Sequence, residues 1–346
     1  MPRTSFLIPL AAVVATACGG NSSPTGPGVP TPPPGAPVSG FVFYDENGNG
    51  LLDPNETVRL PGVTVAIGSR TGTTTAGGRF TLDAVPQGAQ AASVQPGALP
   101  AYFTPGAAVS VVVPQSGGDL ALPAVLALGT NERSNVYMAF GDSITFGDGS
   151  SNGGGYRDPL VADLRAYWGK VSEMYNDGQE ATKSNRGEAR IAASLRSRRP
   201  AYVLILYGTN DYNDAECRNT PPCYTIDSLR SMIVQTREVG AFPVLGTIPP
   251  VNPAYVDKGA DARNAWVTQM NGFVRAMAAQ ERVALAEVYG DLLRQPSLQT
   301  LFADDKHPND AGYAVLSQSF FNAITKPVGA TSSRRPRGFS FSLPGS

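Results

Sequence analysis

The sequence contains one histidine, His307, and the residues around it could take part in nucleophilic catalysis. It lies in Asp-Asp-Lys-His-Pro-Asn at 304–309, while Gly-Asp-Ser-Ile-Thr occupies 141–145 and Gly-Thr-Asn-Asp occupies 208–211. A serine hydroxyl is a poor nucleophile at neutral pH and needs a base within hydrogen-bond reach. A serine, an amide side chain and an Asp-x-x-His segment are together the parts of a serine hydrolase. If such a device operates here, its base must be the single histidine.

Ser143 and Asp304 complete the expected catalytic group. Asp304 precedes His307 by three residues, so both side chains can emerge from one tight loop with the carboxylate beside the imidazole. In that position a carboxylate fixes the imidazole tautomer and stabilises the imidazolium that forms. Asp305 is the weaker candidate, because it lies two residues from the histidine and is expected to face outward. We therefore predict Ser143 as nucleophile, His307 as base and Asp304 as orienting acid.

The elements that must position these residues alternate regularly from about residue 134 onward. Hydrophobic runs typical of strands are each followed by a helical pattern. The expected strands are 135–141, 171–176, 201–207, 242–248 and 283–288, and the expected helices are 158–168, 187–198, 226–239, 262–281 and 310–325. Strict alternation predicts an α/β fold, with a parallel sheet covered by helices on both faces. Reactive groups in such folds collect at the carboxyl ends of the strands, where the three motifs fall.

The three motifs, in this order and at these strand ends, resemble the sequence blocks of the SGNH or GDSL hydrolase family. The resemblance spans about 134–327. Segment 141–145 is similar to the nucleophile block of the family, and 208–211 to its asparagine block. Asp304-x-x-His307 is similar to its terminal block. The resemblance implies a flavodoxin-like α/β/α sandwich in which a serine–histidine pair performs the chemistry.

The same resemblance implies an oxyanion hole, which needs donors aimed at the developing negative charge. Family members supply the backbone N–H of the serine, here Ser143, and the amide of the asparagine, here Asn210. A third donor is a glycine N–H in a block that resembles 176–184, where Ala181 occupies the glycine position. A backbone N–H survives this change if the position does not need positive φ. Ala181 is the expected third donor and Gly178 the alternative.

A second expected domain covers 38–127. Strand-like alternation at 40–44, 63–67, 79–82 and 109–113 is separated by turns rich in glycine and proline, without a helical pattern. A stretch of about 90 residues with this pattern predicts a small β-sandwich.

Residues 45–56 within this domain match the spacing of a calcium-binding loop. The expected oxygen donors are Asp45, Asn47, Asn49, the backbone of Leu51, Asp53 and Glu56, with Gly50 at the sharp turn. Because the flanks are not helical, the segment resembles the calcium-binding B-repeat modules of bacterial surface adhesins. A structural Ca²⁺ ion would tie a strand end to the following turn and take no part in catalysis. The alternative is an Asx-rich turn without metal.

The first residues predict export. Arg3 precedes a short apolar segment that ends in Ala-Thr-Ala-Cys at 15–18, which fits a signal peptide over 1–17. Cys18 resembles the lipidated first residue of a bacterial lipoprotein, and the alternative is an ordinary cleaved signal with an incidental cysteine. The proline-rich residues 18–37 then form a tether. The expected location is the bacterial cell envelope, or secretion if the cysteine carries no lipid.

The composition excludes two classes of partner. The formal net charge is −1, charged residues make up 16% of the chain, and the body has no basic block. The sequence therefore lacks the basic surface that nucleic-acid binding needs. A lipid at Cys18 is the only contact with a membrane that we expect. The tail, 328–346, is expected to be disordered.

Cys217 and Cys223 form an even pair in a chain that is expected to be exported. Such a pair predicts a disulfide that closes a short loop. The loop follows Asn210 closely, so the bridge could stiffen one rim of the active site. The alternative is a disulfide that only stabilises its own loop and has no role at the active site.

These observations predict an exported serine esterase that forms an acyl-serine intermediate and cleaves short-acyl esters. The segment 145–157 is mostly Gly, Ser and Asn, which favours small acyl groups or sugars over long lipids. An exported enzyme with an adhesin-like module also fits a polysaccharide O-deacetylase. The alternatives are a lysophospholipase- or thioesterase-like lipid hydrolase and a non-catalytic surface-binding protein. Nucleotide binding lacks support, because the sequence has no Gly-rich phosphate loop, and no cofactor is expected for catalysis.

Overall fold

The computed structural model describes residues 34–170 and 172–329. The expected signal peptide (1–17) and Cys18 therefore lie outside the described residues, as do most of the 18–37 tether and of the 328–346 tail. Within the described part of the chain, no helix is long and apolar enough to cross a membrane.

A five-stranded parallel sheet forms the centre of the C-terminal region. Its strands lie in the order β10-β9-β11-β12-β13, and every neighbouring pair is parallel. Their bounds are β9 (Arg133–Gly141), β10 (Glu173–Gly178), β11 (Pro200–Leu206), β12 (Phe242–Gly246) and β13 (Ala284–Ala286). Numbered along the chain, this order is 2-1-3-4-5, the doubly wound arrangement of flavodoxin-like folds. The predicted α/β fold is confirmed.

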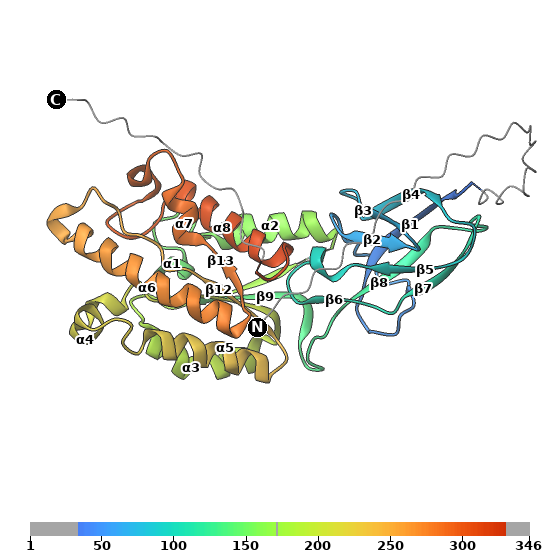
Figure 1. Cartoon of the computed structure of the whole chain (residues 1–346). Coiled ribbons are helices and arrows are strands. Elements are labelled where there is room, and N and C mark those ends of the chain that lie inside the picture. Colours follow the sequence, from blue (N-terminus) through green and yellow to red (C-terminus); the bar gives the residue numbers. More distant parts are fainter. Residues whose placement is uncertain (1–33, 171, 330–346) are drawn as a thin grey trace, which may run out of the picture. The chain divides into compact units, whose positions relative to one another are not determined.

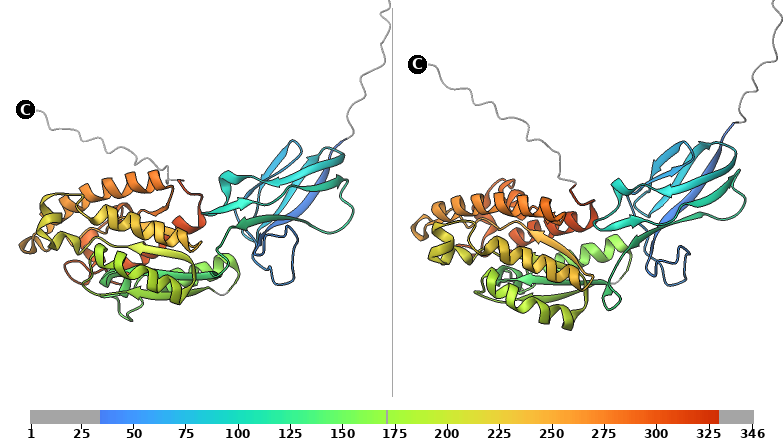
Figure 2. Two further views of the ribbon diagram at one scale, coloured as in Figure 1. Left: turned by 90° about the horizontal axis from the view of Figure 1, so that it is seen from below. Right: turned by 60° about the horizontal axis from the view of Figure 1, so that its bottom comes forward.

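Helices cover both faces of this sheet, as Figure 1 and the two views of Figure 2 show. On one face α2 and α7 pack against α8, and on the other α5 packs against α3 and α6. The bounds are α2 (Arg157–Trp168), α3 (Ser184–Arg198), α5 (Thr225–Glu238), α6 (Ala260–Glu281), α7 (Val288–Leu293) and α8 (Asp310–Thr325). Because the sheet is covered twice, all seven residues of β11 are buried. This explains why the strands read as continuous apolar runs in the sequence.

The last strand is shorter than the sequence predicts. The apolar run 283–288 was expected to be one strand, but β13 ends at Ala286 and α7 begins at Val288. A short apolar run does not distinguish a strand from a buried helix, and the buried Val288 belongs to the helix. The one-turn helix α1 (Ser143–Phe146) and the short α4 (Ala215–Asn219) also lie between the elements that the periodicity predicts.

The N-terminal region forms two four-stranded sheets, in the orders β4-β1-β8-β6 and β3-β2-β5-β7. The bounds are β1 (Ala36–Asp45), β2 (Thr64–Ile67), β3 (Arg70–Thr73), β4 (Arg79–Val85), β5 (Gly88–Val94), β6 (Phe103–Pro105), β7 (Val109–Val113) and β8 (Leu120–Leu126). Buried side chains of both sheets, such as Val42 and Val65, belong to one hydrophobic cluster. The sequence pattern predicted β1, β2, β4 and β7 and missed β3, β5, β6 and β8. In β5, for example, the alternating positions hold Ala and Gln instead of large apolar residues.

Candidate active site

The three motifs meet at the carboxyl edge of the parallel sheet. Ser143 begins α1 directly after β9, and Asn210 follows β11 at the start of a 3₁₀ helix, Asp211–Asn213. Ala181 lies in the loop after β10. Because β9 lies between β10 and β11, the loops that follow these three strands are neighbours. This is the point where the strand order reverses, the place at which doubly wound folds bind ligands.

Ser143, His307 and Asp304 form a continuous chain of hydrogen bonds. The Ser143 Oγ lies 3.0 Å from the His307 Nε2, and the His307 Nδ1 lies 2.7 Å from the Asp304 Oδ2. The side chain of Asp305 does not face the imidazole. Its Oδ1 lies 3.7 Å from the Lys258 Nζ, so Asp304 is the acid beside the histidine.

The loop that carries the histidine is held by its own backbone. Phe302 pairs with Pro308 in an antiparallel bridge, and the Ala303 N–H donates to the His307 carbonyl. Asn309 then caps α8, because its side-chain oxygen accepts from the second and third N–H groups beyond it. The bridge closes the loop that carries His307, and the cap fixes where this loop joins α8. In this arrangement the imidazole lies within hydrogen-bond distance of Ser143.

The Asp304 carboxylate is stabilised in its charged form. Burial alone would raise the pKa of Asp304, but hydrogen bonds from the backbone N–H groups of His307 and Lys306 and from the imidazole outweigh it. The net effect lowers the pKa of Asp304 to about 2. A carboxylate that stays ionised at neutral pH can stabilise a neighbouring imidazolium.

The nucleophile occupies a tight turn between β9 and α1. Asp142 caps the helix, because its Oδ1 accepts from the Ile144 N–H at 3.0 Å. A Cβ at Gly141 would lie 2.4 Å from the carbonyl oxygen of Leu206, so only glycine fits the approach of β11 at this point. Gly147 ends the turn with a φ of 111°, a left-handed conformation that glycine adopts without strain.

Asp142 is buried beside the nucleophile and is electrostatically unlike Asp304. Burial, only partly offset by the N–H of Ile144, raises the pKa of Asp142 to about 7. Its Oδ2 is buried and has no hydrogen-bond partner among the described residues. Protonation removes the cost of burying that charge.

Two of the expected oxyanion donors lie together at this edge. Asn210 is buried, and its Nδ2 donates to the Thr182 carbonyl at 3.1 Å, which fixes the amide and leaves its second hydrogen for a substrate. The N–H of Ser143 is the first of α1, so no carbonyl of its own helix accepts from it. Both can therefore serve an oxyanion near the nucleophile.

The backbone conformation of Ala181, the expected third donor, differs from the prediction. Ala181 has a φ of 57°, although the sequence argument required that this position avoid positive φ. The alanine thus keeps a left-handed backbone at a cost of about 1–2 kcal/mol. Within the described residues no hydrogen bond from the Ala181 N–H is found. The Gly178 N–H, in contrast, donates to the Asn176 Oδ1 at 3.0 Å, so the alternative donor is already engaged.

Asp211 and the disulfide hold the loop that presents Asn210. The buried Asp211 carboxylate accepts from the Ser184 N–H and hydroxyl and from the Thr225 hydroxyl, which links this loop to the starts of α3 and α5. Cys217 and Cys223 form the predicted disulfide a few residues further on. The Cys223 Sγ lies 3.1 Å from the same Thr225 hydroxyl. The bridge therefore adjoins the network that positions Asn210.

Sequence reasoning missed one acidic residue at the site, Asp148. Its Oδ2 lies 3.9 Å from the His307 Nε2, the ring nitrogen that faces Ser143. The available signal was its place as the single acid in the Gly-, Ser- and Asn-rich segment that follows the nucleophile block.

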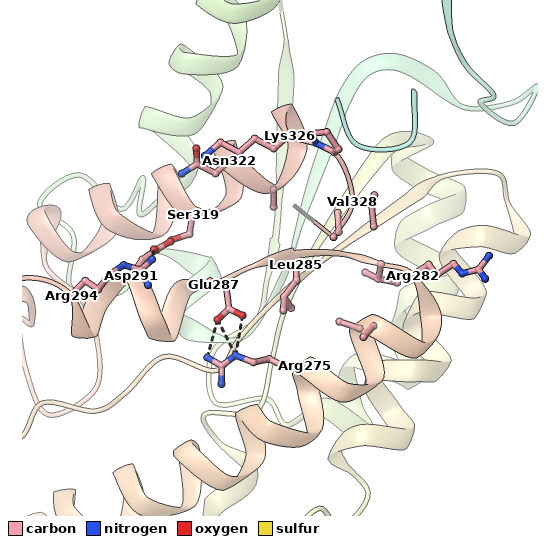
Figure 3. A pocket seen from close by; sticks show the side chains of 17 residues that line it. Arg275, Arg282, Leu285, Glu287, Asp291, Arg294, Ser319, Asn322, Lys326 and Val328 are labelled. Carbon is pink, nitrogen blue, oxygen red and sulfur yellow. Dashed lines mark hydrogen bonds and ion pairs between the residues drawn. The ribbon is translucent and has the colours of Figure 1, made fainter. Parts of the chain in front are cut away.

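A polar pocket borders Ala181, the expected third oxyanion donor, and Ser143, His307 and Asn210 are not among its lining residues. Its volume is about 650 Å³, and its lining includes Ala181, Thr182, Lys183 and Arg186. The volume lies in the range of small-molecule sites. A second groove, of about 590 Å³, lies beside β13 and between α6 and α8, where Figure 3 shows Arg275 paired with Glu287. None of the catalytic candidates lines that second groove.

The expected calcium loop follows β1 and is closed by its own hydrogen bonds. The Asp45 carboxylate accepts from the N–H groups of Gly48, Asn49 and Gly50, and Glu56 accepts from two further backbone N–H groups, those of Glu46 and Asp53. The amides of Asn47 and Asn49 both donate to Asp53, and the Leu51 side chain is exposed. Within 34–170 and 172–329, no three His, Cys, Asp or Glu side chains cluster as metal ligands. Any ion would therefore depend on asparagine and backbone oxygens as well.

The comparison with known families agrees with this geometry. The model of the GDSL-like lipase/acylhydrolase family matches residues 139–315, just over half of the chain. The chain therefore belongs to this family, as the motif blocks predict, and it is a GDSL-family esterase or lipolytic hydrolase. No curated protein is detectably similar to the chain.

Several solved structures are similar to somewhat more than half of the chain. A lipase/acylhydrolase from Enterococcus faecalis is 19% identical with a TM-score of 0.46, covering 55% of this chain and 94% of its own. An acetylxylan esterase from Geobacillus stearothermophilus is 20% identical with a TM-score of 0.46, covering 56% and 95%. An α/β hydrolase from the metagenome of Lake Arreo, Spain, is 23% identical with a TM-score of 0.47, covering 56% and 96%.

Proposed function

We propose that the protein is a serine esterase in which Ser143 is the nucleophile, His307 the base and Asp304 the orienting acid. The observation that carries the proposal is the hydrogen-bonded chain from Ser143 through the imidazole to the Asp304 carboxylate. A neutral imidazole whose Nδ1–H donates to a carboxylate presents a free Nε2 to the serine hydroxyl. These hydrogen bonds are thus arranged for proton transfer from the Ser143 hydroxyl to the His307 Nε2.

The proposed reaction has two steps, acylation of the serine and hydrolysis of the acyl-serine. As the Ser143 Oγ forms a bond to the ester carbonyl carbon, its proton passes to the His307 Nε2. The bond to the leaving alcohol then breaks, and the imidazolium gives that proton to the alcohol oxygen, which leaves an acyl-serine. Water then attacks the acyl carbon and passes a proton to the His307 Nε2. The bond between that carbon and the Ser143 Oγ breaks, the imidazolium returns the proton to the Oγ, and the acid is released. The N–H groups of Ser143 and Ala181 and the Asn210 amide would stabilise the oxyanion in both steps.

We propose short-acyl esters of polar alcohols as the substrates, with acetylated carbohydrates as the favoured class. The support is the polar pocket beside Ala181, which Lys183 and Arg186 line, because such a lining suits a hydrated group better than a long acyl chain. A lysophospholipase- or thioesterase-like activity is the alternative, and a non-catalytic surface-binding protein is a further one.

Hydrolysis of p-nitrophenyl esters from acetate to laurate tests the proposal. We expect turnover confined to short chains in the wild type and a loss of at least 1,000-fold in Ser143→Ala, about 4 kcal/mol of transition-state stabilisation. Ser231→Ala, which changes a serine on α5, should keep wild-type activity. Preference for laurate would favour the lipid alternative. A wild type that neither hydrolyses an ester nor reacts with a fluorophosphonate at Ser143 would contradict catalysis altogether.

We also propose that residues 45–56 bind a structural Ca²⁺ ion in a B-repeat-like module. Asp45 and Glu56 are both 1% exposed, and within the described residues neither forms a salt bridge. Buried carboxylates without a cation are costly, and an oxygen-rich loop is suited to Ca²⁺. We expect the midpoint of thermal unfolding to rise by several degrees in CaCl₂ relative to EGTA, and less in Asp45→Ala. Equal midpoints with and without calcium would contradict the proposal.

We further propose that the protein is exported and lipidated at Cys18. The support is the sequence pattern of 1–18 alone, because these residues lie outside the described structure. Metabolic labelling with a palmitate analogue should mark the wild type and not Cys18→Ala. A labelled variant, or a wild type that stays unlabelled, would contradict lipidation.

A further inference from the structure

The Asp148 carboxylate shares the space in front of the catalytic imidazole. Its Oδ2 is 3.9 Å from the His307 Nε2, which is too far for a direct hydrogen bond. The side chain is 29% exposed, and it forms no hydrogen bond to another described side chain. The carboxylate therefore has acceptor capacity that no other residue in 34–170 or 172–329 uses.

The backbone around Asp148 is fixed on both sides of the site. Its N–H donates to the Ser143 carbonyl at 3.1 Å, and its carbonyl accepts from the Tyr313 hydroxyl at 2.6 Å. The Ser151 N–H, three residues on, donates to the Asp310 side chain. These contacts join the loop to the nucleophile turn and to α8. The backbone of Asp148 is therefore held by the same elements that hold Ser143 and His307.

The chemistry of the ester identifies what passes through this space. The His307 Nε2 first accepts the Ser143 proton and then gives it to the oxygen of the leaving alcohol. That oxygen must come within about 3 Å of Nε2 when it is protonated. A hydroxyl on the carbon next to it then lies within reach of the Asp148 Oδ2. An aliphatic alcohol without such a hydroxyl has nothing to donate there.

We propose that Asp148 determines specificity for the leaving alcohol by accepting a hydrogen bond from a hydroxyl adjacent to the ester oxygen. The site would then prefer esters of polyols and sugars that carry a neighbouring free hydroxyl, and it would disfavour leaving groups that carry a carboxylate at that place. This inference rests on the proposed esterase function. It assigns no proton transfer to Asp148, which touches the leaving group while His307 performs the transfer.

Three acetates with leaving groups of similar size test the proposal: ethyl acetate, ethylene glycol monoacetate and O-acetylglycolate. The measured quantity is the ratio of kcat/KM for the glycol ester to kcat/KM for the ethyl ester. A hydrogen bond to a charged acceptor contributes on the order of tenfold, so Asp148→Ala should lower this ratio about tenfold. Asp148→Asn keeps a neutral acceptor and should give an intermediate ratio. O-acetylglycolate should gain relative to ethyl acetate in both variants, because a like charge has been removed.

The ratio is independent of the fraction of a variant that folds, because all esters are measured on one sample. Asp163→Asn removes a carboxylate from an exposed position of α2 and should leave the ratio unchanged. Equal ratios in the wild type, Asp148→Asn and Asp148→Ala, with an active wild type, would overturn the role of Asp148 and leave the esterase function intact. A wild type that hydrolyses none of the three esters or p-nitrophenyl acetate would overturn the esterase function, and this inference with it.

Discussion

Two aspartates flank the Ser143–His307 pair, one on the nucleophile turn after β9 and one on the loop before α8, and their pKa values are shifted in opposite directions. Asp142 is 1% exposed, keeps one oxygen unpartnered, and has its pKa raised to about 7. The Asp304 side chain is 42% exposed and accepts three hydrogen bonds, and its pKa is lowered to about 2.

The difference separates two uses of one residue type. The backbone N–H groups and the imidazole around Asp304 stabilise a charge, and a charge is what a developing imidazolium needs. Around Asp142 burial outweighs the backbone N–H groups of Ile144 and of Asp142 itself, so this residue caps the helix and is easiest to bury when protonated. Hydrogen bonds therefore decide which carboxylate can take part in catalysis.

The largest effect is expected from Asp304→Asn. We expect kcat/KM for p-nitrophenyl acetate to fall by about 100- to 10,000-fold, because an amide cannot stabilise the imidazolium and can favour the wrong tautomer. Asp305→Asn removes the neighbouring carboxylate, which lies near Lys258, and should cost less than about threefold. Similar losses in the two variants would show that the loop, and not the Asp304 charge, supports catalysis.

Gly149→Ala should separate the two loops that carry Ser143 and His307. Gly149 has a φ of 87°, and a Cβ there would lie 2.6 Å from the Pro308 carbonyl oxygen. We expect a loss of about 2–3 kcal/mol in the free energy of unfolding, measured by urea titration, together with reduced activity.

Gly153→Ala is the matched control for this change. Gly153 lies in the same loop with a φ of 71°, but a Cβ there would meet no atom within 4 Å. It should therefore lose only the conformational part, about 1 kcal/mol. Equal losses at the two positions would contradict contact between the loops as the cause.

Asp142→Asn should change how stability depends on pH. Because the pKa of Asp142 is raised in the folded protein, the folded state holds more protons than the unfolded chain between about pH 4 and about pH 7. The contribution of Asp142 to the free energy of unfolding of the wild type therefore falls as pH rises through this window. In the variant the asparagine does not titrate, so this decrease is absent. A shift of about three pKa units corresponds to about 4 kcal/mol, so we expect the variant to gain on the order of 4 kcal/mol relative to the wild type between pH 4 and pH 8.

The contribution of Asp304 has the opposite sign. Its pKa is lowered on folding, so its contribution is present above about pH 4 and is lost as pH falls toward about 2. Both proteins share this contribution, so it cancels from the difference between Asp142→Asn and the wild type. Urea unfolding at pH 5 and pH 8 measures that difference, and a difference that is the same at both pH values would contradict a raised pKa at Asp142.

The smallest effect is expected from Ala181→Gly. Glycine relieves the left-handed strain at φ 57° and loses part of that gain to the greater freedom of the unfolded chain. We expect a net gain of about 0.5 kcal/mol in the free energy of unfolding, with kcat/KM within twofold of the wild type. A loss of stability would show that the alanine methyl group makes a favourable contact that exceeds the strain.

Much of the site could be predicted from residue types and spacing. The single histidine of the chain predicts the base, His307, and the three-residue spacing favours Asp304 over Asp305 because it allows the carboxylate to lie beside the ring. Asp148 could not be found in this way, because its distance from Nε2 depends on how the loop after α1 packs against the loop before α8. For the same reason, the positive φ of Ala181 follows from its loop and not from its residue type.

The sequence by itself determined the α/β fold and the order of its motifs, because alternating apolar runs and helical patterns are local properties of the chain. It also determined which residue types are available for proton transfer. Only the tertiary structure decided that Asp148 also lies near His307, and that the pKa of Asp142 is raised while the pKa of Asp304 is lowered. The distance of Asp148 from His307 depends on how two loops pack, and the pKa shifts depend on burial and on loop conformations that aim nearby N–H groups at a carboxylate. All of these exist only after the strands and loops have packed.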